Sequence, residues 1–177
     1  MRLETERLVL RRLSPADVDV LAPYFADPEV VRFLGGEPRT REEVATSIAY
    51  FIRAFDLDGI GQFAVERKED GLVLGRCGIL NWETDPWRPV ARAEATKPTE
   101  TEIGYALGRP HWGQGYATEA ATAVRDYARS ELERERLIAL IHEDNVASKR
   151  VAEKLGMAYE HDVELQLATV GLYALVV

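Results

Sequence analysis

The feature that most constrains this 177-residue sequence is the stretch from Thr101 to Glu119, which reads TEIGYALGRPHWGQGYATE. Residues 102–107 alternate apolar and polar side chains, the pattern of a half-buried strand. Pro110 has no N–H for a sheet ladder, so regular pairing ends before it. Behind Gly113 and Gly115, small apolar residues recur at three- and four-residue spacing from about residue 116, which indicates a helix. The stretch therefore predicts a strand, a tight glycine turn and a helix in immediate succession.

A glycine turn placed directly before a helix has the chemistry of an anion-binding site. The first four backbone N–H groups of a helix have no intrahelical partner, and the positive end of the helix dipole lies there. Glycines let a ligand approach the backbone without meeting a Cβ atom. Together these features suit phosphate or pyrophosphate. The alternative is a tight connection that binds nothing, and the two glycines alone leave both interpretations open.

Composition and charge narrow the classes of function. The length suits one domain over residues 1–177. The formal net charge of -8 argues against a nucleic-acid partner and is compatible with a cationic substrate. No apolar run approaches a membrane span, and residues 1–7 are too charged for a signal peptide. A single cysteine, Cys77, and histidines without metal-ligand spacing lead us to expect a reducing, cytoplasmic setting and no metal.

Periodicity and turn signals predict an alternation of strands and helices. Strands are expected at residues 3–13, 62–67, 72–82, 102–107 and 137–141. Helix starts are signalled by Ser14-Pro15, by Asp27-Pro28 and by a capping box from Thr40 to Glu43. Residues 83–100 contain three prolines and are expected to form a long loop.

A second polar constellation follows the strand expected at 137–141, which reads as a parallel strand buried on both faces. Asn145 is a natural N-cap for the next helix, and Ser148 falls at its third position. One interpretation is that Asn145 only caps and Ser148 only fills a helical position. The functional interpretation places both side chains between the fourth and fifth expected strands, beside the glycine turn.

The order of elements resembles the GCN5-related N-acetyltransferase (GNAT) fold, and in particular the RimJ/RimL-type branch that acetylates the N-termini of ribosomal proteins. The resemblance is carried by ETERLVLRR from residue 4, EIGY from residue 102, WGQGYATEA from residue 112, and NVAS and KLGM from residues 145 and 154. Trp112 stands where the family's general motif has Gln or Arg, which is usual for the ribosomal branch. The implied fold is α/β, with a mixed, mostly antiparallel sheet of about seven strands, splayed between strands 4 and 5 and flanked by about four helices.

The resemblance implies an acetyl-CoA-dependent N-acetyltransferase that moves an acetyl group to a primary amine, either a protein N-terminal α-amine or a small-molecule amine. Transfer would occur by direct attack in a ternary complex, without a metal. The residues that would bind acetyl-CoA are Tyr105, Leu107, Trp112, Gly113, Gln114, Gly115, Tyr116, Ala117, Thr118, Asn145 and Ser148. In the family, the glycine turn holds the pyrophosphate and the strand backbone meets the pantetheine.

The chemistry requires a neutral amine, because an ammonium has no lone pair with which to attack a thioester. At pH 7 a lysine-like amine is neutral in only about one molecule in a thousand, and an α-amine in about one in ten. Glu102 is the candidate general base, and a strand-face carboxylate with a structural partner is the alternative. Ser148 is the candidate hydrogen-bond donor to the departing thiolate, because Ala152 stands where many relatives have a tyrosine, and Tyr159 is a weaker candidate.

The identity of the acceptor is not defined by the sequence. The acceptor groove is expected between the two early helices, the 83–100 segment and the final hairpin. Acidic residues there could attract a cationic amine, although solvated loop charge explains them equally well: Glu37, Glu83, Asp85, Glu94, Asp162 and Glu164. Relatives often form homodimers, but no interface can be read from this chain.

Other functions fit the sequence less well. A dinucleotide-binding fold would need a further glycine or alanine at Thr118 and more strand–helix units than the remaining chain can supply. A phosphate-loop kinase would need a lysine after the glycine turn. The main alternative is a non-catalytic acyl-CoA-binding sensor or regulatory module on the same fold.

Overall fold

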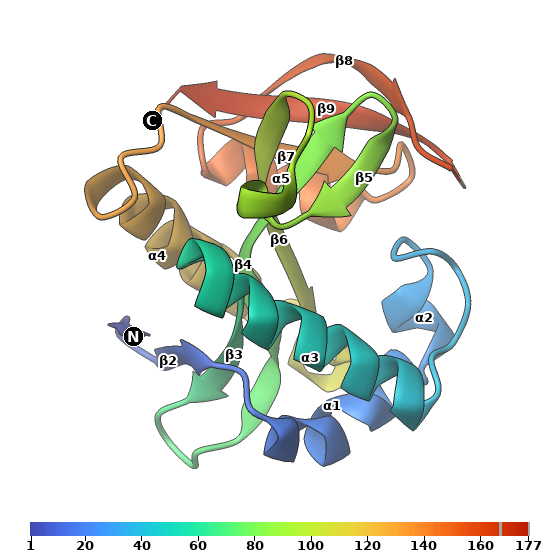
Figure 1. Ribbon diagram of the computed structural model, residues 1–177. Helices are drawn as coiled ribbons and strands as arrows, with labels where there is room; N and C mark the ends of the chain where they lie inside the picture. The colour runs from blue at the N-terminus through green and yellow to red at the C-terminus, as the bar shows by residue number, and fades with distance from the viewer. Residues whose placement is uncertain (167, 177) are drawn as a thin grey trace.

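The computed structural model describes residues 1–166 and 168–176, and these form one mixed sheet with helices on both of its faces (Figure 1). The strands are β1 (Arg2–Glu4), β2 (Leu8–Arg12), β3 (Gln62–Arg67), β4 (Val73–Thr84), β5 (Trp87–Val90), β6 (Thr99–Leu107), β7 (Arg136–Ile141), β8 (Ala158–Glu164) and β9 (Thr169–Val176). The α-helices are α1 (Val18–Phe25), α2 (Pro28–Val31), α3 (Arg41–Asp58), α4 (Tyr116–Ser130) and α5 (Val146–Lys154).

The strand order across the sheet is β1-β2-β3-β4-β6-β7-β9-β8, and β5 pairs with the end of β4. Among the described residues every pairing is antiparallel except that of β6 with β7. These two parallel strands are in register at a single position, Glu102 opposite Ile138, whereas β6 pairs with β4 along its whole length. The predicted mixed, mostly antiparallel sheet with a splay between the expected fourth and fifth strands is therefore confirmed.

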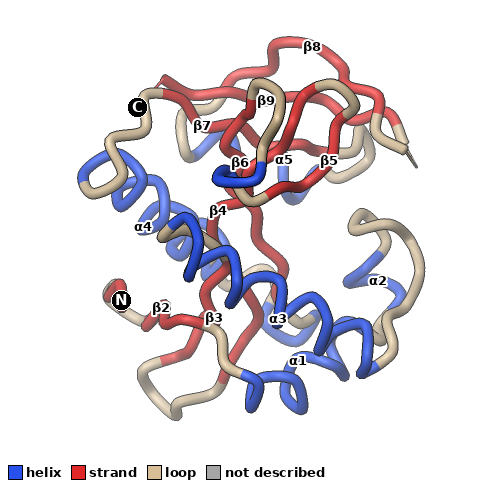
Figure 2. The backbone as a smooth tube through the Cα atoms, viewed as in Figure 1, coloured by secondary structure: helices blue, strands red, loops and turns tan. Residues whose placement is uncertain are grey.

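Helices cover the two faces of the sheet with different apolar clusters. On one face Phe25, Ile48 and Phe51 of α1 and α3 pack with Ala64 of β3 and Ala106 of β6. On the other face the alanine-rich side of α4 packs over β3, β4 and β6. Figure 2 shows α1 with β2 and β3 at the lower end of the molecule, and β5, β8 and β9 at the upper end. The layer of α1–α3 therefore lies on one side of the sheet, and α4 and α5 lie on the other.

Local capping explains why the predicted helices begin where they do. The Thr40 hydroxyl accepts a hydrogen bond from the N–H of Glu43 at 3.2 Å, and the Glu43 carboxylate accepts one from the N–H of Thr40 at 2.7 Å. This reciprocal pair is the capping box expected from the sequence, and it starts α3 at Arg41. Asp27 caps the single turn of α2 through the N–H of Glu29.

The structure corrects two expectations about the strands. The strand expected at residues 3–13 is two strands, β1 and β2, because the Thr5 hydroxyl binds the N–H of Leu8 and turns the chain between them. The expected loop at residues 83–100 contains the end of β4, strand β5 and the start of β6. The described residues therefore form nine strands and five α-helices, rather than about seven and about four. No helix in the described part of the chain is long and apolar enough to cross a membrane.

Candidate active site

The glycine turn between β6 and α4 exposes the backbone at the start of a fifteen-residue helix. Gly113 and Gly115 have φ angles of +74° and +84°, in the left-handed region that favours glycine. A Cβ atom on Gly113 would meet nothing within 4 Å, so the turn is open on that side. Gly115 occupies the N-cap position without a side-chain cap, so the first amide groups of α4 remain available to a ligand. This geometry fits the expected pyrophosphate.

Arg7 and Glu119 hold this turn against the first two strands. The Arg7 side chain donates to the carbonyl of Gln114 at 3.0 Å and to the Glu119 carboxylate at 2.7 Å, and its guanidinium stacks over the Tyr116 ring at 4.5 Å. Glu119 also accepts from the Thr5 hydroxyl and from the N–H of Arg7. Burial opposes ionisation of Glu119, but these hydrogen bonds and the Arg7 charge keep its pKa below the ordinary value.

Trp112 and Leu107 tie the turn to the end of β6. The Trp112 indole N–H donates to the carbonyl of Leu107 at 2.7 Å, while 46% of the Trp112 residue surface stays exposed. The ring nitrogen of Trp112 is therefore used within the turn. The exposed ring surface of Trp112 is therefore the part that could contact a cofactor.

Tyr105 connects β6 to α5 across the splay. Its hydroxyl donates to the carbonyl of Ser148 at 3.1 Å. Asn145 Oδ1 accepts from the N–H of Ser148 at 3.1 Å, so Asn145 does cap α5 as predicted. Burial raises the pKa of Tyr105, and a side-chain hydrogen bond with Ser148 acts in the other direction. The hydroxyl of the half-buried Ser148 therefore faces the Tyr105 hydroxyl at the start of α5.

Glu102 lies on the opposite face of β6 from Tyr105, because alternate residues of a strand point to opposite sides. Its Oε2 atom accepts from the indole N–H of Trp82 on β4 at 2.7 Å. Burial raises the pKa of Glu102 to about 7, although the Trp82 hydrogen bond, the N–H of Leu140 and the charge of Arg76 act in the other direction. A carboxyl group with this pKa can accept or release a proton near neutral pH.

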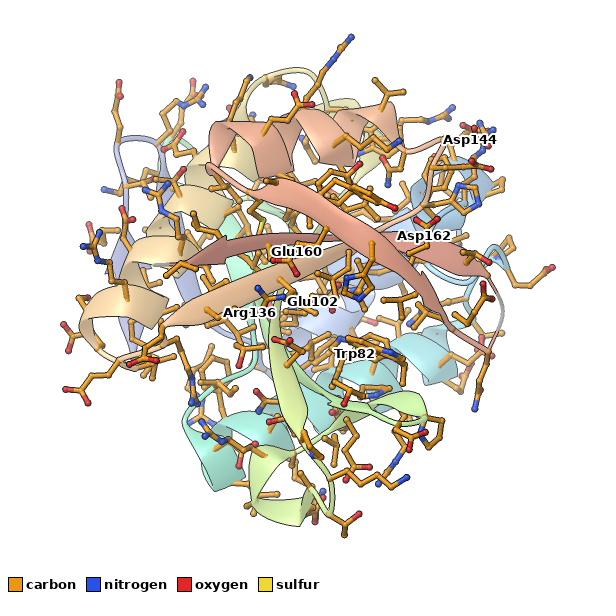
Figure 3. All side chains as sticks on the ribbon, turned by 90° about the horizontal axis from the view of Figure 1, so that it is seen from above. Trp82, Glu102, Arg136, Asp144, Glu160 and Asp162 are labelled. Atoms are coloured by element: carbon orange, nitrogen blue, oxygen red, sulfur yellow. The ribbon has the colours of Figure 1, made fainter. Side chains whose placement is uncertain are left out.

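Figure 3 shows Glu102 and Trp82 side by side near the middle of the sheet, with Arg136 and Glu160 close by. Arg136 of β7 forms a bidentate pair with Glu160 of β8 at 2.7 and 2.8 Å and also reaches Glu100 of β6. Arg136 and the two glutamates are therefore paired with one another at the edge of the site. Glu102 is left with a neutral indole as its side-chain partner, which is the arrangement expected for a base rather than for half of an ion pair.

The acidic residues proposed to attract a cationic acceptor are mostly engaged in structural contacts. Glu83 is buried and accepts from Arg88 and from the backbone of Thr96 and Lys97, so it holds the 83–100 segment together. Glu94 pairs with Arg53. The other members of the set with partners are Asp85 (Lys97), Asp162 (the Tyr159 hydroxyl) and Glu164 (Thr169).

Two further groups have limited roles. Burial raises the pKa of the Cys77 thiol to about 12, so it stays protonated at neutral pH and is a poor nucleophile. The Tyr159 hydroxyl is bound to Asp162 on the exposed strand β8, so this hydroxyl already has a partner. The described residues contain no cluster of His, Cys, Asp or Glu that could hold a metal ion.

Sequence reasoning assigned no role to four residues that the structure places at the site: Arg7, Gln62, Arg76 and Trp82. Each acts through a partner far away along the chain, such as Trp82 with Glu102 or Arg7 with Glu119. Local periodicity cannot reveal such pairs. The one available signal was the motif containing Arg7, which carried part of the family resemblance without suggesting a role.

Comparison with known proteins identifies a family. Residues 7–158 match the family model described as "Acetyltransferase (GNAT) domain". The chain is 33% identical to the uncharacterized N-acetyltransferase p20 of Bacillus licheniformis, over 89% of this chain and 83% of p20. It is 32% identical to the uncharacterized protein YkkB of Bacillus subtilis, over 97% of this chain and 94% of YkkB.

Solved structures agree on the fold. An acetyltransferase from Agrobacterium tumefaciens superposes with a TM-score of 0.80 at 27% identity, covering 99% of this chain and 94% of that one. RimL, a ribosomal L7/L12 α-N-protein acetyltransferase solved with coenzyme A, has a TM-score of 0.80 at 16% identity, covering 100% of this chain and 98% of RimL. At that identity, the likeness to RimL concerns the fold alone.

Proposed function

Because this chain belongs to the GNAT acetyltransferase family, we propose that it transfers the acetyl group of acetyl-CoA to a primary amine with Glu102 as the general base. The observation that carries the proposal is the position of Glu102. Its carboxyl group, with a pKa of about 7, lies at the register position where β6 and β7 begin to separate. Proteins of this family use acetyl-CoA as co-substrate. The proposal therefore concerns the residues that bind acetyl-CoA and carry out the transfer, and the amine that accepts the acetyl group.

Acetyl-CoA would lie in the splay with its pyrophosphate on residues 113–118. The open left-handed glycines and the uncapped start of α4 support this placement. The amide side chain of Asn145 has its oxygen bound within α5, so its NH₂ group is the part left to meet the cofactor arm. The backbone of Tyr105 and Leu107 borders the same splay and would contact the pantetheine and the thioester carbonyl.

In this proposal, the amine and the departing thiolate lie on opposite faces of β6. A primary amine would approach on the Glu102 face, beneath the layer of α1–α3, and lose a proton to the carboxylate as its nitrogen forms the bond to the acetyl carbon. The thiolate of coenzyme A would leave toward the α5 face, where the hydroxyl of Ser148 would hydrogen-bond to sulfur. The protonated thiol of Cys77 supports direct attack rather than an acetylated enzyme.

The acceptor is proposed to be a protein N-terminal α-amine or a small-molecule amine. The RimJ/RimL-type motif at Trp112 and the fold shared with RimL support the first of these, although a fold does not define a substrate. The negative net charge of the chain favours cationic acceptors of either kind.

The test is a screen for release of free thiol from acetyl-CoA in the presence of a panel of peptides with different N-terminal residues and a panel of small primary amines. We expect at least one amine to give thiol release that Glu102→Gln reduces by about 100-fold or more. Acetyl-CoA binding without amine-dependent thiol release from either panel would favour the non-catalytic sensor instead.

A further inference from the structure

Two half-buried arginines on the face of the sheet that carries the proposed base have only neutral partners. Arg76 of β4 donates to Oε1 of Gln62 at 2.8 Å. Arg39, just before α3, donates to the Ser47 hydroxyl at 3.3 Å and to the carbonyl of Leu34 at 3.0 Å. Neither arginine forms an ion pair within the part of the chain that the structure describes. Removing a guanidinium from water is costly unless an anion compensates its charge, so the pair indicates that an anion belongs there.

The two guanidinium groups border one small cavity between α1, α3 and β4. The rest of its lining comes mostly from apolar side chains of the two helices. The Arg76 guanidinium lies against the rings of Phe25 and Phe51, at 5.5 and 5.2 Å. Burial and the like charge of Arg39 lower the pKa of Arg76 to about 10, although the charge of Glu102 acts in the other direction. Arg76 therefore stays charged at neutral pH, and the cavity combines positive charge with apolar walls.

A third donor beside these arginines also lacks a partner. Gln62, the first residue of β3, is fully buried, and its Nε2 atom has no hydrogen-bond partner among the described residues. Its oxygen is bound to Arg76, so the amide offers only its NH₂ group. A Cβ atom built on Gly104 would lie 3.6 Å from that nitrogen and 3.9 Å from Glu102 Oε2, so the unpaired donor lies close to the proposed base. A ligand that fits here must supply acceptor atoms and negative charge.

The sheet register gives the separation between the arginine and the proposed base. Gln62 lies opposite Gly78, which in turn lies opposite Gly104. Through its bond to Gln62, the Arg76 side chain reaches this row of the sheet. Glu102 lies two residues from Gly104 on the same face of β6, which is about 7 Å along a strand. A molecule held at Arg76 by one end can therefore present its other end to Glu102 when a few carbon atoms separate the two ends.

We propose that the amine acceptor carries a carboxylate group, which binds to Arg76 and Arg39 while the amine meets Glu102. The inference rests on the proposed function and names its substrate class. A carboxylate is small, and it accepts the paired parallel hydrogen bonds that a guanidinium donates. Such an acceptor is a zwitterion, so the negative net charge of the chain does not repel it. Free amino acids and peptides with an acidic first residue share this chemistry.

The test pairs each carboxylate-bearing amine with its neutral amide. One arm uses glycine, β-alanine and γ-aminobutyrate against their amides. The other uses peptides that begin with aspartate or glutamate against peptides that begin with asparagine or glutamine. Thiol release from acetyl-CoA gives kcat and KM, and calorimetric titration in the presence of coenzyme A gives the affinity without turnover. We expect the natural protein to prefer the carboxylate member of at least one pair by about tenfold or more, in kcat/KM and in affinity.

Two variants and a matched control connect this preference to the arginines. Arg76→Lys keeps the charge but loses the paired donors, and Arg39→Gln removes the charge. Arg12→Lys is the control, because Arg12 also lies over a phenylalanine ring, that of Phe55, but is paired with Asp56. We expect both variants to lower the ratio of carboxylate to amide kcat/KM by about tenfold, through a higher KM for the carboxylate member, and the control to keep the natural ratio. A folding defect would affect both members of a pair, so the ratio isolates the carboxylate contact.

The outcomes separate the carboxylate site from the proposed transferase. Equal use and equal binding of both members of every pair by the natural protein would overturn the inference, and so would a preference that survives in both arginine variants. A preference confined to one arm would support the site and identify the source of the carboxylate, either a free amino acid or an acidic first residue. Preferential binding that the variants abolish, without thiol release from any pair, would refute the proposed transferase and support the carboxylate site.

Discussion

The carboxyl group of Glu102 couples catalysis to pH. A general base works only when it is ionised, and burial raises the pKa of Glu102 to about 7. The rate under subsaturating amine should therefore rise through about pH 7 as Glu102 ionises, in addition to the rise that follows the neutral fraction of the amine. Glu102→Gln should lose this limb, so that its rate follows only the neutral fraction of the amine. A profile of kcat/KM against pH for both proteins checks this, and identical shapes would remove Glu102 as the base.

The same raised pKa means that ionised Glu102 lowers the free energy of unfolding at high pH. Its ordinary pKa is 4.5, so between about 4.5 and 7 the folded chain keeps a proton that the unfolded chain releases. The corresponding stability is present below about pH 4.5 and is lost as pH rises through about 7. Glu102→Gln should therefore raise the free energy of unfolding, relative to the natural protein, by about 1–3 kcal/mol more at pH 8 than at pH 4.5. Urea denaturation at both pH values measures this, and a difference independent of pH would contradict it.

Two groups of Ser148 have different roles: the backbone N–H takes part in the helix cap, and the hydroxyl is proposed to take part in the chemistry. Its N–H completes the cap of Asn145, whereas its hydroxyl takes no part in that cap. Ser148→Ala keeps the N–H, so stability should change little while acetyl transfer slows about tenfold. The matched variant Asn145→Ala should instead lower the free energy of unfolding by about 1 kcal/mol through loss of the cap. Single-turnover kinetics and denaturation distinguish the two, and full transfer activity in Ser148→Ala would leave its hydroxyl without a role.

At the scale of elements, the glycine turn depends on the β1–β2 segment as much as on α4. Arg7 holds the Gln114 carbonyl and Glu119, so its side chain prepares the turn before any ligand arrives. Arg7→Met should weaken acetyl-CoA binding about tenfold, through loss of a charged contact worth about 1.5 kcal/mol. Arg2→Met removes an exposed cation of β1 that pairs with Glu4 and serves as the control. Equal affinities of the two variants by calorimetry would contradict the role given to Arg7.

Elements with local signals could be predicted, and elements defined by distant partners could not. The capping box at Thr40 and the glycine turn before Tyr116 are short-range features, and α3 and α4 begin where they predict. Strand β5 was missed because Pro86 and Pro89 indicate a loop, yet an edge strand tolerates proline when its pairing with β4 is short. The turn at Thr5 that separates β1 from β2 carries no glycine or proline and depends on one hydroxyl.

At the scale of the whole molecule, the resemblance supplied what local patterns could not. It indicated the splay between β6 and β7, which the structure confirms, and it identified the family. The resemblance did not predict the electrostatics of the site. The Trp82–Glu102 contact and the Arg76–Gln62 contact join residues that only the sheet register brings together. The residue assignments for cofactor and catalysis therefore remain predictions that binding and kinetics must test.

Acetyl-CoA is proposed to bind on the glycine turn of an active enzyme, and calorimetric titration with acetyl-CoA tests this placement. Gly115→Asp adds a side chain and a negative charge at the proposed pyrophosphate seat, and Gly36→Asp makes the same change at an open glycine with a φ of +85° in the loop after α2. We expect the natural protein and Gly36→Asp to bind alike, and Gly115→Asp to bind about 100-fold more weakly or not at all. Undiminished affinity in Gly115→Asp, or no binding by the natural protein, would contradict this placement of acetyl-CoA.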